Sequence, residues 1–274
     1  MNHRKTLPML AAVACLSVAC GTATTAQSPA RPAADTTEEQ NEKTVLRLFS
    51  EGFNEGRTDV VRELAGTAAD DQVELFADIK AKVPGAVATV KHAGADGDLV
   101  AVHWQASATP ADENTGRARA DLYRVTGGKI VQHWGVEQEV PATTASGNSL
   151  FSDVYKYPNG APALSEDQEE TNKQLVVQVY GNMLNDPGLV DANYAPEYHQ
   201  HNPQVPNGPG ALKDMLANVP AAMKTGVPRQ FDFQVADGDL VWVSDKNFAG
   251  VDIFRVAGAK IVEHWDVVGP MPGQ

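Results

Sequence analysis

Cysteine is almost absent from this chain of 274 residues, in which only Cys15 and Cys20 occur. Cys15 lies inside an N-terminal apolar run that we expect to be removed as a signal, so Cys20 would be the only cysteine of the mature protein. A single thiol excludes an internal disulfide and a zinc site built from cysteines. It also leaves no candidate for a cysteine nucleophile within the folded part of the chain.

The N-terminal segment has the pattern of an export signal, in which Arg4 and Lys5 precede an apolar run from Leu7 to Ala19. The run is too short to cross a bilayer as a helix. It ends in LSVAC, which fits a bacterial lipoprotein signal of residues 1–20 and predicts lipidation of Cys20. An ordinary secretory signal that is cut nearby is the alternative. Both interpretations predict an exported protein, either anchored to the cell membrane by lipid or secreted.

Positive charge is also scarce, because 22 Lys and Arg stand against 35 Asp and Glu and give a formal net charge of −13. Without residues 1–20 the balance is 20 basic against 35 acidic side chains, a net charge of −15. Such a balance argues against nucleic acid or an anionic membrane surface as a partner. The chain has no Gly-rich phosphate-binding loop and no second long apolar run. We therefore expect contact with the membrane through the lipid anchor only.

A long internal repeat is what the chain does contain. The sequence DGDLV occurs at 96–100 and at 237–241. In addition, DLYRVTGGKIVQHW at 121–134 matches DIFRVAGAKIVEHW at 252–265, which begins 131 residues later. Each unit has the size of a small domain, unlike the short period of a solenoid. We therefore expect two tandem copies of one fold.

Composition divides the remainder of the chain. Residues 21–40 lack large apolar side chains and are expected to form a flexible tether. Residues 141–170 are rich in Ser, Gly, Pro and acidic residues, which is typical of a linker. The first copy then spans 41–140 and the second spans 171–274.

Both copies begin with apolar residues at helical spacing and continue with alternating strand patterns. The first copy predicts helices at 41–56, near 60–64 and at 73–79, then strands at 85–92, 98–108, 117–125 and 130–138. The second predicts helices at about 175–183, 188–193 and 211–223, an extended segment at 198–202, and strands near 230–236, 239–245, 248–256 and 260–268. This order predicts an α+β fold of two tandem cone-shaped domains, in each of which helices pack on a curved antiparallel sheet. The open end of such a cone suits a pocket.

The two copies differ most in the block YHQHNP at 198–203, which only the second copy contains. A segment that carries histidines and is missing from one copy indicates the working part of the other. We therefore interpret the first copy as a degenerate partner domain that packs on the second or caps its pocket. A separate specificity of the first copy is the alternative.

The segments YHQHNPQVPNGPGALK (198–213), DGDLV (237–241) and VDIFRVAGAKIVEHWDVV (251–268) closely resemble the SnoaL-like polyketide cyclases. That family lies within the nuclear transport factor 2-like superfamily, and the branch predicted to catalyse aldol condensation is the most similar. The likeness covers the second copy, whereas the first copy resembles the superfamily in its opening helix and last three strands. The resemblance implies a cone with a deep apolar pocket. It also implies cofactor-free acid–base catalysis of an intramolecular aldol closure, by an Asp with a His or Asn nearby.

Two aspartates and a histidine are candidates for that chemistry. Asp252 and Asp266 bracket a predicted hairpin, and His264 shares a strand face with Asp266. If the register brings Asp252 near them, like charges in an apolar pocket raise one carboxyl pKa, so that an acid and a base coexist near neutral pH. The first copy keeps Asp121 and His133, so a purely structural role for Asp252 and His264 is the alternative. The counterpart of Asp266 in the first copy is a glycine, which makes this carboxylate specific to the second copy.

His201 and Asn202 belong to the block that is unique to the second copy. We expect His201 to act as an acid/base or as a donor to an enolate oxygen, and Asn202 to act as a neutral donor. A structural His–Asn–Pro corner is the alternative. His199 shares a strand face with His201, so a metal site with Asp252 or Asp266 is a further alternative, although the resemblance implies no metal. His199 also replaces the apolar residue that is usual in the family, and we assign it to ligand binding.

Aromatic side chains complete the predicted pocket. Tyr180, Tyr198 and Trp242 are expected at its mouth, and Phe254 shares a strand face with Asp252. A plain core role for these aromatic residues is the alternative.

The sequence therefore predicts that the second domain binds a small, largely apolar carbonyl compound and catalyses a cofactor-independent acid–base reaction. Aldol condensation, cyclisation and isomerisation are the candidate reactions, with Asp266 and His201 as the main pair. The rival is a non-catalytic module at the cell surface that binds a hydrophobic ligand or a protein. An enzyme should place at least two ionisable groups within reach of one point of the pocket. Pairing of the two domains within the chain, or a homodimer, is expected as well.

Overall fold

The computed structural model describes residues 36–270, apart from the side chain of Ala222. The predicted signal, its lipidation site Cys20 and residues 21–35 of the predicted tether lie outside the described residues. Within them, no helix combines the length and the apolar character that a membrane crossing requires.

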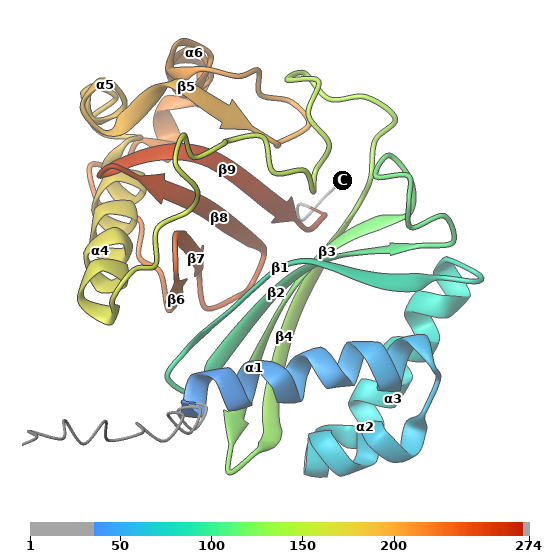
Figure 1. Ribbon diagram of the computed structural model, residues 1–274. Coiled ribbons are helices and arrows are strands. Elements are labelled where there is room, and N and C mark those ends of the chain that lie inside the picture. The colour runs from blue at the N-terminus through green and yellow to red at the C-terminus, as the bar shows by residue number, and fades with distance from the viewer. Residues whose placement is uncertain (1–35, 271–274) are drawn as a thin grey trace, which may run out of the picture. The chain divides into compact units, whose positions relative to one another are not determined.

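The N-terminal half opens with helices that cover one face of a sheet (Figure 1). They are α1 (Thr37–Arg47), the π-helical segment η1 (Leu48–Asn54), α2 (Thr58–Ala65), the short η2 (Gly66–Ala68) and α3 (Ala69–Lys82). The first helix begins inside the predicted tether, because Thr36 and Glu39 form a capping box that satisfies free N–H groups of its first turn. Phe49 and Phe53 are buried on the face that meets the sheet.

The first sheet is an antiparallel meander in the order β1 (Val87–Asp96), β2 (Leu99–Ser107), β3 (Arg117–Thr126) and β4 (Lys129–Glu139). Each of the two DGDLV repeats makes a tight turn between strands. Gly97 and Gly238 have positive φ angles of 60° and 56°. Glycine adopts this conformation without the steric cost that a Cβ atom brings, so the same Asp-Gly dipeptide forms the turn in both copies.

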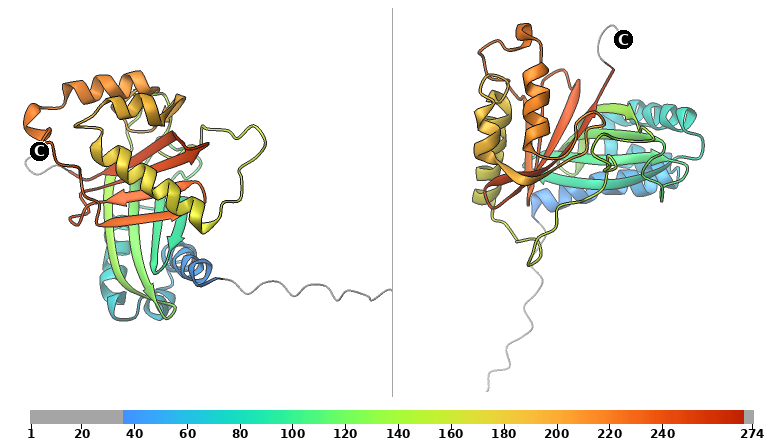
Figure 2. Two further views of the ribbon diagram at one scale, coloured as in Figure 1. Left: turned by 90° about the vertical axis from the view of Figure 1, so that its left-hand side faces the viewer. Right: turned by 90° about the horizontal axis from the view of Figure 1, so that it is seen from above.

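The C-terminal half repeats the plan with one addition. Its helices are α4 (Glu166–Asn182), α5 (Gly188–Asn193), α6 (Pro209–Asn218) and the short η3 (Ala221–Met223). Its strands are β5 (Tyr194–Gln200), β6 (Phe233–Asp237), β7 (Leu240–Ser244), β8 (Gly250–Ala257) and β9 (Lys260–Val268), in the sheet order β5-β9-β8-β7-β6. Helix α4 lies across β6 and β7 (Figure 2). The added strand β5 pairs in parallel with β9 and carries the first residues of the YHQHNP block.

Both halves therefore have the predicted α+β architecture. Several predicted bounds are displaced, and the opening helix of the second copy, α4, begins at Glu166, inside the predicted linker. The helix expected at 211–223 ends at Asn218, because Pro220 follows and excludes the helical conformation for the residue before it. The strand expected from 230 begins at Phe233.

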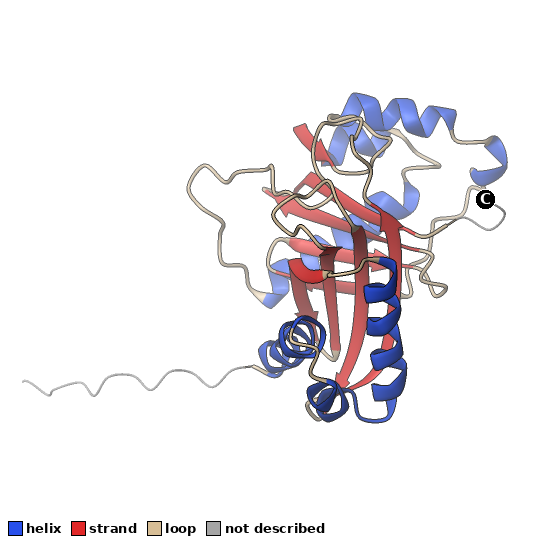
Figure 3. Cartoon of the chain, turned by 90° about the vertical axis from the view of Figure 1, so that its right-hand side faces the viewer, coloured by secondary structure: helices blue, strands red, loops and turns tan. Residues whose placement is uncertain are grey.

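The segment between β4 and α4 runs as a loop without helix or strand (Figure 3). It is nevertheless well packed. Phe151 is buried in one apolar cluster together with side chains of both sheets, among them Leu122 and Trp265. The backbone N–H of Val154 donates a 2.6 Å hydrogen bond to the fully buried carboxylate of Glu263. The predicted linker is thus part of the folded core.

Candidate functional site

A cavity of about 540 Å³ opens in the C-terminal half, bounded by α4, β5, α6 and the strands β8 and β9. Much of its wall is apolar or aromatic, formed by Tyr180, Met183, Tyr194, Tyr198, Val205, Leu212, Met215 and Phe254. Asp252, His264 and Asp266 line the same cavity. An apolar hollow with a few convergent polar groups is the usual form of a small-molecule site.

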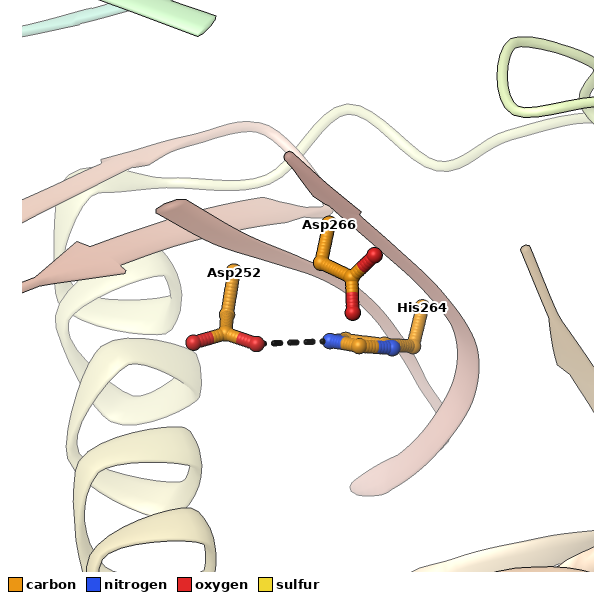
Figure 4. Close-up of side chains that lie close together, drawn as sticks. All are labelled: Asp252, His264 and Asp266. Atoms are coloured by element: carbon orange, nitrogen blue, oxygen red, sulfur yellow. Dashed lines mark hydrogen bonds and ion pairs between the residues drawn. The ribbon is translucent and has the colours of Figure 1, made fainter. Parts of the chain in front are cut away.

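The three ionisable side chains converge because of strand register. Asp252 on β8 pairs directly with Asp266 on β9, and His264 lies two residues earlier on the same face of β9. One ligand atom from each residue lies within 4.8 Å of the others. His264 Nε2 is 3.1 Å from Asp252 Oδ1 (Figure 4). The predicted meeting of two carboxylates and an imidazole on one wall is present.

Gln200 fixes which nitrogen of His264 faces the carboxylates. Its Oε1 accepts hydrogen bonds of 2.9 Å from the backbone N–H groups of both His201 and Asn202, which sets the orientation of the amide. The same Oε1 lies 2.8 Å from His264 Nδ1, so Nδ1 must carry a proton and donate. Nε2 is therefore the nitrogen that faces the carboxylates inside the cavity.

Only one of the two oxygens of the Asp266 carboxylate has a hydrogen-bond donor among the described residues. Its Oδ2 accepts a 2.6 Å hydrogen bond from Asn202 Nδ2, whereas its buried Oδ1 has no partner among the described residues. Burial raises the pKa of the Asp266 carboxyl, and the nearby Asp252 raises it further, against a lowering effect of His264. The carboxyl is thus shifted toward the protonated form, as a group that exchanges protons near neutral pH requires.

Asp252 is held by groups around the cavity. Tyr180 Oη donates a 2.6 Å hydrogen bond to Asp252 Oδ1. Arg229 lies 4.0 Å from Asp252 Oδ2 and packs over the ring of Tyr180. Burial and then the charge of Asp252 hold the pKa of Tyr180 well above its usual value, so this hydroxyl acts as a donor.

His201 does not form the predicted pair with Asp266. Its side chain lies outside the cavity and is stacked on Trp265, with Nδ1 2.5 Å from the carbonyl oxygen of Ser149 and Nε2 3.0 Å from Glu263. The cause is alternation along the chain, because Gln200 already faces the cavity and the next side chain points to the opposite side. The structure therefore does not bring His201 and Asp266 together, contrary to the expected pair.

Two residues that were predicted to bind the ligand, His199 and Trp242, also lie outside the cavity. His199 does not line the cavity, and His201 points elsewhere, so this pair forms no metal site with the aspartates. Trp242 is buried in the apolar cluster shared by the two sheets, where it packs against Gly94. The other predicted aromatic residues, Tyr180, Tyr198 and Phe254, do line the cavity. Asn202 lines it too and contacts Asp266.

The first copy contains the same aspartate–histidine pair without a cavity residue equivalent to Asp266. His133 Nε2 is 2.7 Å from Asp121 Oδ1, and Arg119 Nη2 contacts the same oxygen at 3.1 Å. A Cβ atom at Gly135 would lie 2.3 Å from Asp121 Oδ1, so a side chain there would clash. The aspartate–histidine pair alone is therefore a feature of the fold, and the second carboxylate is what distinguishes the C-terminal site.

Sequence reasoning missed Gln200 and Arg229. Gln200 stands in the YHQHNP block, and its position between two outward-facing residues of a predicted strand could have identified it. Arg229 follows the last helix in a loop, and no pattern in the sequence marks it as a neighbour of Asp252.

Residues 33–133 match the sequence model of the SnoaL-like domain. The match falls on the first copy, whereas the residues that suggested this family lie mainly in the second. No curated protein matches the chain. Among solved structures, IdmH from Streptomyces antibioticus, a candidate polyketide cyclase, is 25% identical with a TM-score of 0.30 and covers 36% of this chain and 91% of its own. A candidate SnoaL-like polyketide cyclase from Jannaschia sp. CCS1 is 20% identical with a TM-score of 0.33, covering 38% and 89%. TsrD from Streptomyces laurentii is 19% identical with a TM-score of 0.30, covering 38% and 89%.

Proposed function

We propose that the second copy of this chain, whose residues 33–133 match the sequence model of the SnoaL-like domain, is the catalytic partner of the first. The C-terminal cavity binds a small, largely apolar carbonyl compound. It catalyses a cofactor-independent acid–base reaction, namely aldol condensation, cyclisation or isomerisation. The first copy supports the second and has no cavity chemistry of its own.

One observation carries this proposal: Asp252, His264 and Asp266 surround one point of an apolar cavity, within 4.8 Å of one another. A binding module needs no such convergence, because a hydrophobic ligand is held by apolar surface and a few hydrogen bonds. Arg229 reaches Asp252 only at 4.0 Å, so neither carboxylate is fully neutralised by an arginine. This arrangement favours an enzyme over the non-catalytic alternative.

The groups divide the work of an enolisation as follows. The Asp266 carboxylate removes a proton from the carbon next to the substrate carbonyl, and the resulting enolate oxygen is stabilised by a hydrogen-bond donor of the cavity wall. The enolate carbon either attacks a second carbonyl, in an aldol closure, or regains a proton at another carbon, in an isomerisation. His264 Nε2, backed by Asp252, supplies or accepts the proton that completes the cycle.

A turnover screen of the full chain tests the proposal. The substrates are small diketones and enolisable aromatic ketones, and exchange of the carbon-bound proton with deuterium is followed by NMR. We expect exchange that Asp266→Asn lowers by about 10²- to 10⁴-fold. The control is Asp214→Asn, an exposed aspartate of α6 outside the cavity. Ligand binding without exchange in the unaltered chain would favour the binding module.

Export and lipid anchoring remain a separate proposal that rests on the sequence motif at Cys20. Cell fractionation of the producing bacterium tests it. We expect the protein in the membrane fraction and a Cys20→Ser variant in the soluble fraction. Recovery of the unaltered protein from the soluble extracellular fraction would instead indicate a plain secretory signal.

A further inference from the structure

The C-terminal cavity holds two carboxyl groups that have few cationic neighbours. Asp252 and Asp266 pair across β8 and β9, and the nearest cation to either in residues 36–270 is Arg229, 4.0 Å from Asp252. Asp266 forms no ion pair in this part of the chain, and its buried Oδ1 has no partner. A buried carboxylate oxygen without a donor is costly, so a group that residues 36–270 do not supply belongs beside it.

The first copy provides an internal comparison. There, the guanidinium of Arg119 lies 3.1 Å from Asp121 and also pairs with Glu137 at 2.6 Å. A Cβ atom at Gly135, the counterpart of Asp266, would lie 3.1 Å from Arg119 Nη2. The cation of the first copy therefore stands close to the place where the second copy has a carboxylate. The first copy thus has a counter-ion beside this place, where the second copy has a further carboxylate.

The donor set of the second copy suits a metal ion. Because Gln200 accepts from His264 Nδ1, the lone pair of neutral His264 is on Nε2, facing the carboxylates. Histidine ligands in metal sites are commonly fixed in this way by a hydrogen bond from the other ring nitrogen. Asn202 holds Asp266 and Tyr180 holds Asp252, each by a 2.6 Å bond, so both carboxylates are oriented from outside the cluster.

The combination of one imidazole and two carboxylates limits which metal ions the site can bind. Zinc binds imidazole nitrogen and carboxylate oxygen at about 2.0–2.2 Å in tetrahedral geometry, which places two such ligand atoms about 3.4 Å apart. His264 Nε2 and Asp252 Oδ1 are already 3.1 Å apart. An imidazole in the set favours transition metals over calcium and magnesium, which prefer oxygen ligands only. The cavity beyond the three residues leaves room for water on the open side of the ion.

We propose that Asp252, His264 and Asp266 form a binding site for one divalent transition-metal ion of the zinc type. Bound there, the ion occupies the lone pairs that the proton transfer needs, so it inhibits the reaction reversibly. The inhibition rests on the proposed function, whereas the binding does not.

Calorimetric titration of the chelator-treated full chain with Zn²⁺ tests the binding. We expect one ion per chain, with an affinity at least tenfold weaker for Asp266→Asn and for Asp252→Asn, and unchanged for His199→Ala, whose imidazole lies outside the cavity. Ca²⁺ should bind far more weakly than Zn²⁺. Thermal melting of each variant shows that it is folded. Absence of stoichiometric binding, or binding that only His199→Ala removes, overturns the site.

The proton-exchange assay separates this inference from the proposed function. Exchange that is lost on adding one equivalent of Zn²⁺ and returns with chelator supports the inhibitory role. If exchange requires Zn²⁺, the metal site is correct, but the proposed inhibition and the cofactor-independent reaction are both wrong. If Zn²⁺ does not bind while exchange still depends on Asp266, the metal site is wrong and the acid–base proposal stands.

Discussion

Asp96 and Asp237, the first residues of the two DGDLV repeats, each accept a hydrogen bond from the backbone of the other copy. Asp96 Oδ2 lies 3.1 Å from the N–H of Ala236, and Asp237 Oδ2 lies 2.9 Å from the N–H of Ala95. The contacts are reciprocal, as expected when two copies of one fold meet through the same surface. The repeat that is most obvious in the sequence therefore serves to join the copies.

Removal of this joint should destabilise the protein. Asp237→Ala leaves the N–H of Ala95 without its acceptor, and we expect a loss of about 1–2 kcal/mol in the free energy of unfolding, measured with urea. The matched control is Asp98→Ala in the same motif, which breaks only an ion pair with Arg124 at the surface and should cost well under about 1 kcal/mol. Equal losses in the two variants would contradict a specific joint.

Gln200 should control the tautomer of His264. In Gln200→Leu the acceptor for Nδ1–H is gone, so we expect a mixture of the two tautomers in ¹⁵N NMR spectra of the imidazole and a fall in proton-exchange activity of at least about tenfold. Gln200→Glu keeps an acceptor and should keep the tautomer. An unchanged imidazole spectrum in Gln200→Leu would show that the glutamine has no such role. Gln178→Leu, on the exposed side of α4, is the control.

Stability should fall in mild acid because of His103. This imidazole is fully buried, and burial, followed by the neighbouring His92, holds its pKa well below the usual value. Below about pH 6.5 the unfolded chain binds a proton that the folded protein does not, so stability decreases as the pH falls and is unaffected above that pH. The slope should approach about 1.4 kcal/mol per pH unit.

Unfolding curves between pH 7 and 5 measure this effect. His103→Gln should flatten the dependence, because glutamine does not titrate. If the slope of the His103→Gln variant equals that of the unaltered protein, another group is responsible.

Any side chain at Gly135 should destabilise the protein. Its added Cβ atom would approach Asp121 Oδ1 to 2.3 Å, so we expect Gly135→Ala to lower the free energy of unfolding by about 1–3 kcal/mol. Gly210→Ala in α6 is the control, since nothing lies within 4 Å of its Cβ and alanine favours the helix. Melting temperatures that rise for both variants would show that Arg119 and Asp121 can move aside.

Much of the fold followed from periodicity and from the repeat. The alternation in β8 and β9 placed Asp252, His264 and Asp266 on one face, because a strand has a strict period of two. Strand ends and helix ends were less accurate: a capping box starts α1 early, and Pro220 stops α6.

The predicted pairing of His201 with Asp266 was wrong because of the same two-residue alternation. The block unique to the second copy does reach the cavity, but through Gln200 and Asn202, and the imidazole between them points away. Histidine was favoured for its chemistry, whereas position along the strand decides which residue faces the ligand. Arg229 was beyond prediction, because a loop residue reaches Asp252 only through the tertiary fold.

The loop between the copies limits which fragments of this protein can be studied in isolation. Val154 caps the buried Glu263, and Phe151 lies in the apolar cluster with Trp265. A fragment cut after the loop would expose Trp265 and would remove the backbone donors of Val154 and Tyr155 from Glu263, on the face of β9 opposite Asp266. Such a fragment would be expected to aggregate or to rearrange β9, so inactivity of an isolated C-terminal half would say nothing about the chemistry of the intact chain.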